Sequence, residues 1–191
     1  MCYNVWQKGE IRKMETLEIT SNKITLSDPC YELGTWCMIQ DIPFPNGVYR
    51  VHAEKQDIPN WGERVCEIAV YNKDIVPENE GREMDILWEE LNGEVGVDSG
   101  MAGIYDSEYY KKSHKENSVD KNWYNEVCNI LDVFERVHYG VKDNSCVVSS
   151  SGFGDGGYTA YIGKLGDKTV AAKIVFIDET DFEDEEVDEE E

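Results

Sequence analysis

Apolar and polar residues alternate over several short stretches of the chain, and this alternation is typical of strands with one buried face. Residues 23–28 show it with the β-branched Ile24 and Thr25, and residues 48–53 repeat it. Taken along the sequence, the pattern predicts strands over residues 23–28, 35–42, 48–53, 64–71, 93–98, 146–150, 158–162 and 170–177. Residues 83–91 fit either a short helix or an extended segment.

Prolines and glycines punctuate these stretches. Pro29 ends the first one, because proline cannot donate to a strand ladder. Asn46 and Gly47 favour a tight hairpin that joins residues 35–42 to residues 48–53. Glycine-rich turns separate the last three predicted strands, so these strands are expected to form an antiparallel meander.

One segment has the period of an amphipathic helix. Asp120 is a good N-cap residue. The apolar residues that follow at helical spacing are Trp123, Val127, Ile130, Phe134 and Val137. Gly140 comes just after this stripe, as a helix-terminating glycine often does, so we predict a helix near residues 120–138.

Many strands and one clear helix predict an α+β domain of mainly antiparallel β-structure, a sandwich-like sheet with one packed helix. We expect a single globular domain over residues 15–177, preceded by a loose N-terminal arm over residues 1–14. Residues 178–191 hold 11 acids in 14 positions, so mutual repulsion is expected to keep this tail disordered.

The formal net charge of −22 makes direct nucleic-acid binding improbable, because contacts to phosphates need clustered Lys and Arg. An acidic surface favours a basic protein partner, although it also serves solubility alone. No stretch of about 18 apolar residues and no secretory signal is apparent, so we expect a cytoplasmic protein without a membrane segment. The six cysteines form no CxxC pair and the three histidines are scattered, so neither a metal nor a cofactor is predicted.

Three glycine-rich segments at strand ends carry polar side chains that could converge on a small ligand. The candidate ligand-binding residues are Asp28, Asp98, Ser99, Asp155, Tyr158 and Trp61. Turn chemistry is the alternative, because Asp and Ser also hydrogen-bond to nearby main-chain groups and glycine permits positive φ.

No residue is predicted to be catalytic. Cys30 lies beside Asp28 and Glu32, and neighbouring acids make a thiol a poorer nucleophile. Ser99 lacks the Gly-x-Ser-x-Gly context of a nucleophile elbow, because Val97 stands at the first glycine position. His138 is explained by the expected helix C-terminus, where a cationic side chain is favourable.

Several segments together resemble an uncharacterised family of phage and bacterial genomes. They read SDPCY at 27–31, GTWC at 34–37, WGERV at 61–65, GVDSGMAGIYD at 96–106 and GDGGY at 154–158. The resemblance implies a prokaryotic or phage-infected cytoplasm and carries no catalytic residue with it.

Two functional hypotheses follow. The first is a non-catalytic acidic interaction protein, such as a phage-type inhibitor that binds a basic nucleic-acid-handling or defence protein of the host. The second is a small-molecule-binding or hydrolytic site built from Asp28, Asp98, Ser99 and Asp155. Convergence of these four residues in one pocket would favour the second hypothesis, and dispersal would favour the first.

Overall fold

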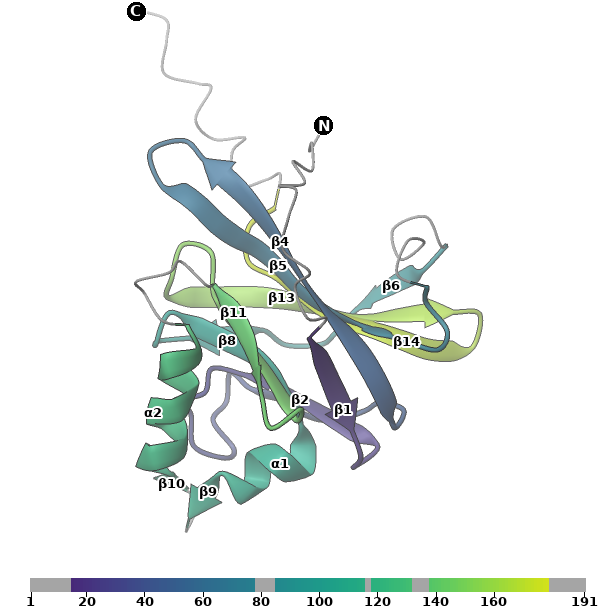
Figure 1. Ribbon diagram of the computed structural model, residues 1–191, viewed down its shortest axis with the longest axis horizontal. Helices are drawn as coiled ribbons and strands as arrows, with labels where there is room; N and C mark the ends of the chain where they lie inside the picture. The colour runs from purple at the N-terminus through teal and green to yellow at the C-terminus, as the bar shows by residue number, and fades with distance from the viewer. Residues whose placement is uncertain (1–14, 78–84, 116–117, 132–137, 179–191) are drawn as a thin grey trace, which may run out of the picture.

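The computed structural model describes residues 15–77, 85–115, 118–131 and 138–178 (Figure 1). In chain order the elements are β1 (Thr16–Ile19), β2 (Lys23–Ser27), β3 (Ile39–Pro43), β4 (Gly47–Ile58), β5 (Gly62–Asn72), β6 (Leu87–Glu90), β7 (Val95–Val97), β8 (Met101–Asp106), α1 (Ser107–Lys112), β9 (His114–Lys115), β10 (Ser118–Val119), α2 (Lys121–Ile130), β11 (Tyr139–Lys142), β12 (Cys146–Ser150), β13 (Gly156–Leu165) and β14 (Lys168–Val175).

The strands form two main antiparallel sheets. The larger sheet has the order β1-β4-β5-β14-β13-β6, with β7 also paired to β13. The smaller sheet has the order β11-β12-β8-β2-β3, and β9 and β10 pair only with each other. The predicted class, α+β with mainly antiparallel β-structure, is confirmed.

The main core lies between the two sheets. From the smaller sheet it receives Leu26, Ile104 and Val147, and from the larger sheet Ile68 and Ile174, all fully buried. Strand period explains this arrangement, because alternate residues of one strand point to opposite faces.

The second face of the smaller sheet packs against the helices, which lie together on one side of the molecule (Figure 1). Tyr105 of β8 and Val148 of β12 face this layer and meet Tyr110 of α1 and Trp123 of α2. Strand β8 therefore lies between two apolar layers, and all six of its residues are buried.

Helix α2 confirms the predicted N-cap, since the Asp120 carboxylate accepts the N–H groups of Asn122 and Trp123. Its end was wrongly predicted. The described helix ends at Ile130, and Gly140 lies within β11, paired with Val148. The predicted stripe residues Phe134 and Val137 lie outside the described residues.

Strand pairing also differs from the prediction. Residues 35–38 form a turn, and β3 begins only at Ile39. The expected hairpin at Asn46 and Gly47 is wrong, because β3 and β4 belong to different sheets. The predicted meander is reduced to the β13–β14 hairpin, since β12 pairs with β8 and β11. Local pattern identifies strands, whereas partner choice depends on burial against the whole fold.

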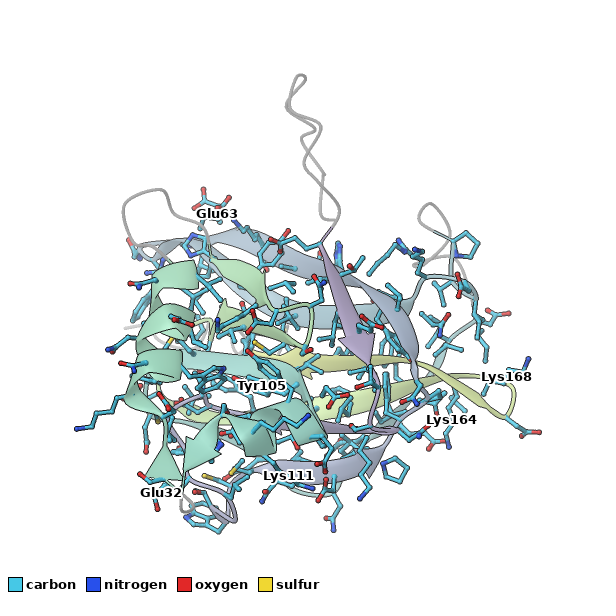
Figure 2. The ribbon with its side chains drawn as sticks, turned by 60° about the horizontal axis from the view of Figure 1, so that its bottom comes forward. Glu32, Glu63, Tyr105, Lys111, Lys164 and Lys168 are labelled. Atoms are coloured by element: carbon cyan, nitrogen blue, oxygen red, sulfur yellow. The ribbon has the colours of Figure 1, made fainter. Side chains whose placement is uncertain are left out.

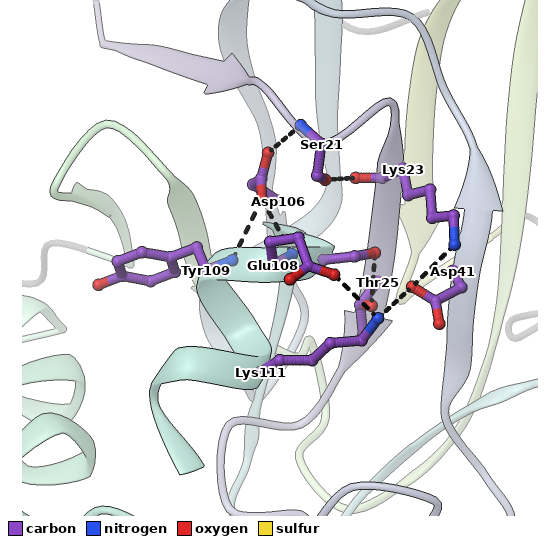
Figure 3. A network of polar contacts seen from close by, with 9 residues as sticks. Ser21, Lys23, Thr25, Asp41, Asp106, Glu108, Tyr109 and Lys111 are labelled. Atoms are coloured by element: carbon purple, nitrogen blue, oxygen red, sulfur yellow. Dashed lines mark hydrogen bonds and ion pairs between the residues drawn. The ribbon is translucent and has the colours of Figure 1, made fainter.

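Asp106 fixes the junction between β8 and α1 (Figure 3). One carboxylate oxygen caps the helix by accepting the N–H groups of Glu108 and Tyr109. The other accepts the N–H groups of Thr20 and Ser21, at 2.7 and 2.9 Å. The capped helix thereby becomes tied to the turn between β1 and β2.

The expected arm, residues 1–14, and residues 179–191 of the expected tail lie outside the described residues. Within the part of the chain that is described, no helix combines the length and apolarity needed to cross a membrane.

Candidate functional site: a pocket beside the β4–β5 hairpin

Asp28 follows β2 and is fully buried. Its Oδ1 atom accepts the Cys30 N–H and the Ser99 hydroxyl, both at 2.7 Å. Its Oδ2 atom accepts the main-chain N–H groups of Asp98 and Ser99, at 2.9 and 2.7 Å. Such a buried carboxylate is stabilised by its hydrogen bonds, and here they join the end of β2 to the turn between β7 and β8.

The structure therefore brings Asp28, Asp98 and Ser99 together, but largely through main-chain groups. Only the N–H of Asp98 bonds to Asp28, and the Asp98 side chain is exposed. Burial, followed by the neighbouring carboxylates of Asp28 and Asp98, raises the pKa of the Cys30 thiol to about 12. Such a thiol is almost entirely protonated at neutral pH, so Cys30 is a poor nucleophile.

Asp155 and Tyr158 serve a different turn. Asp155 is exposed. The Tyr158 hydroxyl lies 2.8 Å from the Ser151 carbonyl oxygen and 2.7 Å from that of Gly154, so it holds the turn between β12 and β13. Neither residue lines the pocket described next.

A pocket of about 540 Å³ opens between the β4–β5 hairpin, the β7–β8 turn and the end of α2. It is lined by Trp61, Gly62, Glu63, Arg64, Ser99, Met101, Cys128, Leu131, His138 and Ser150. Of the predicted site residues, Trp61 and Ser99 are therefore in its wall.

Hairpin geometry places Trp61 at the pocket. Strand β4 ends at Ile58, which pairs with Gly62, and the Trp61 N–H closes the turn onto the Ile58 carbonyl at 3.0 Å. Asn60 and Gly62 have φ of +66° and +71°, conformations that Asn and Gly tolerate well. The Trp61 side chain is 53% exposed and meets the Phe153 ring edge-on at 5.2 Å.

Charges in the pocket wall are unevenly paired. Glu63 lies 3.2 Å from the Lys55 ammonium and 3.8 Å from His138 Nε2. Arg64 lies over the Trp61 ring, 5.9 Å from its centroid, and donates from Nη1 to the Glu63 carbonyl oxygen. Within the described residues, the Arg64 guanidinium forms no ion pair with a carboxylate.

Beside Ser99, the Tyr124 phenol and the Cys128 thiol provide further polar groups on α2. Burial, and then the adjacent Cys128 thiol, raise the pKa of Tyr124 to about 12, while hydrogen bonding with Ser99 acts in the opposite direction. Tyr124 is therefore a neutral hydrogen-bonding group at physiological pH. Ser150 presents a hydroxyl that forms no hydrogen bond within the described part of the chain.

Within the described residues, Ser99 and Asp28 are arranged as a structural pair rather than as a nucleophile and its base. The Ser99 hydroxyl gives its hydrogen to Asp28, which is already occupied by main-chain donors. No group of three or more His, Cys, Asp or Glu side chains suited to a metal occurs among the described residues.

Arg64, His138 and Ser150 were missed as site residues. The explanation of His138 by a helix C-terminus is wrong, because α2 ends at Ile130 and His138 directly precedes β11. The sequence did offer a reason to consider Arg64, since it lies within the WGERV segment together with Trp61. Ser150 had none, because a serine at a strand end is ordinary.

The family model described as "Protein of unknown function (DUF4241)" matches residues 17–175, so the chain belongs to this family. Neither a curated protein nor a solved structure matches the chain.

Proposed function

We propose that this DUF4241 family member is a binding protein that takes up a small molecule in the pocket beside the β4–β5 hairpin. The pocket itself carries the proposal. Its volume of about 540 Å³ falls within the range of small-molecule sites, about 300–1,000 Å³. Apolar groups of Met101 and Leu131 stand beside a few polar groups, which is the usual composition of such sites.

Binding is favoured over hydrolysis by the role of Asp28. A catalytic base must be able to accept a proton from the nucleophile. Asp28 instead holds the β7–β8 turn through the main-chain N–H groups of Asp98 and Ser99 and the Ser99 hydroxyl, and it also accepts the N–H of Cys30. The Cys30 thiol, with its raised pKa, offers no alternative nucleophile.

Fragment screening by NMR tests the proposal. With ¹⁵N-labelled tryptophan the five indole N–H groups are observed separately, and the Trp61 signal is assigned with Trp61→Phe. Fragments that bind the pocket should shift the Trp61 signal and leave that of Trp36, which is 84% exposed, unchanged.

Ser150→Phe should abolish these shifts by filling the pocket. Lys168→Phe is the matched control, because Lys168 is exposed and lies far from the Glu63 end of the molecule (Figure 2). Shifts that persist in Ser150→Phe, or a diverse library that never moves the Trp61 signal, would rule out the pocket as the binding site.

The net charge of −22 favours a second candidate function, electrostatic association with a basic protein. For a basic partner captured from a bacterial lysate, the association rate should fall steeply as salt increases, because salt screens surface charge. Removing residues 178–191, with 11 acids, should slow association more than it speeds dissociation. An association rate that is independent of salt and of this segment would exclude the idea.

A further inference from the structure

We infer that the ligand of this pocket is a small organic anion with a planar apolar body, recognised by Arg64 and Trp61. The inference rests on the proposed function and adds the chemical class of the ligand. It starts from an unusual distribution of charge. The chain has 40 acidic and 18 basic residues, yet the guanidinium at the pocket has no carboxylate partner within the described residues.

The acidic side chain in the pocket wall already has a partner. Glu63 is the acidic residue of the pocket wall, and its Oε1 atom lies 3.2 Å from Lys55 Nζ and 3.8 Å from His138 Nε2. Lys55 therefore offsets the charge of Glu63, and no carboxylate among the described residues forms an ion pair with Arg64. A carboxylate or phosphate group would supply the missing partner.

Arg64 also has donors to spare. A guanidinium carries five N–H donors in a rigid fork that matches the two oxygens of a carboxylate or phosphate. One Arg64 nitrogen, Nη1, donates to the Glu63 carbonyl oxygen at 3.0 Å. The guanidinium carbon lies 5.9 Å from the centroid of the Trp61 ring, within reach of a cation–π contact that keeps the group beside this ring.

The aromatic groups define the other half of the ligand. Trp61 and Phe153 are 53% and 38% exposed, although large aromatic side chains are usually buried. Their edge-on contact at 5.2 Å forms an exposed apolar surface, which reaches the pocket wall through Trp61. A planar ring can pack on this surface while its anionic group reaches Arg64 and its edge meets Met101 and Leu131.

Three probes of equal shape and different charge test this assignment, namely 2-naphthoate, 2-naphthamide and 2-naphthylmethylammonium. Charge-assisted hydrogen bonds are about twice as strong as neutral ones, so the naphthoate should bind about tenfold more tightly than the amide. The ammonium probe should bind most weakly. Affinities come from calorimetry, and the Trp61 indole signal shows whether each probe occupies the pocket.

Variants identify the group responsible. Arg64→Gln should remove the preference for naphthoate over naphthamide, while Arg64→Lys should retain part of it, because the charge remains and the fork is lost. Lys168→Gln makes the same change of net charge at the far end of the molecule and should leave the preference intact (Figure 2).

The outcomes separate the two levels of the argument. If the probes shift the Trp61 signal but the amide or the ammonium binds as tightly as the naphthoate, the ligand class is wrong and the pocket stands. An unchanged preference in Arg64→Gln likewise overturns the role of Arg64. If no probe moves the Trp61 signal at millimolar concentration, the proposed pocket function fails as well.

Discussion

Replacing Asp28 tests whether this carboxylate is a structural anchor or a ligand group. Asp28→Asn keeps the size of the side chain but retains only one acceptor oxygen. Of the four donors that now bond to Asp28, two can remain paired and two will face the amide NH₂ group. A hydrogen bond to a charged group contributes about 1.5–3 kcal/mol, so losing two should lower the free energy of unfolding by about 3–6 kcal/mol.

Two matched variants refine the expectation. Ser99→Ala removes one of the four hydrogen bonds and should cost about 1.5 kcal/mol. Asp98→Asn leaves the main-chain N–H in place and alters an exposed side chain, so stability should change by less than about 0.5 kcal/mol. In the Asp28→Asn background, Ser99→Ala should cost less than it does alone, because the two residues share a hydrogen bond.

Urea titration measures these differences as shifts of the midpoint at constant slope. The structural interpretation of Asp28 is refuted if Asp28→Asn unfolds at the wild-type midpoint. It is also refuted if Asp98→Asn is as destabilising as Asp28→Asn, because the side chain of Asp98 would then take part in the anchor.

Three further predictions concern buried groups. The Tyr105 hydroxyl is buried without a hydrogen-bond partner in the described structure, whereas that of Tyr110 donates to the Tyr31 carbonyl at 2.9 Å. Tyr105→Phe should therefore leave the melting temperature unchanged or raise it. Tyr110→Phe should lower the free energy of unfolding by about 1–2 kcal/mol and so lower the melting temperature. A larger loss of stability in Tyr105→Phe than in Tyr110→Phe would contradict these hydrogen-bond assignments. At neutral pH, Cys30 should react with iodoacetamide far more slowly than an ordinary thiol, because its pKa is raised to about 12. Mass spectrometry measures the rate of labelling, and rapid labelling of Cys30 would contradict the prediction. Burial alone would raise the pKa of Asp106, but the N–H groups of Thr20, Tyr109 and Ser21 outweigh burial and lower it. A lowered carboxyl pKa stabilises the fold above the unfolded value, about 3.9, and this contribution is lost as pH falls through the folded value. Asp106→Asn should thus lose less stability than wild type during acid titration below about pH 4, and parallel titration curves would disprove the role of this carboxylate.

Strand positions followed well from the sequence, whereas strand partners did not. Alternation located residues 23–27 and most of 62–72 because each strand has a period of two that is set by its own backbone. The assignment of β3 and β4 to different sheets depends on which apolar faces meet across the molecule, and Asn46 shows the result. Its side chain accepts the Asn22 N–H at 2.7 Å rather than turning a hairpin.

The residues that were conspicuous in the sequence proved to be those that build turns. Asp28, Ser99 and the glycine beside it attract attention because acids, hydroxyls and glycines gather where a chain reverses direction, and these residues are used largely for that purpose.

A pocket wall needs no such residues. Arg64 stands half-buried on an ordinary strand, and its proposed role rests on the observation that no carboxylate among the described residues forms an ion pair with it. Composition reports the total of −22 and does not locate an individual cation such as Arg64, because net charge is a sum over the chain while recognition depends on which charges lie within a few ångströms of one another. Under the two proposals, a small anion at Arg64 and a basic protein on the acidic surface would be bound at different places on the same molecule.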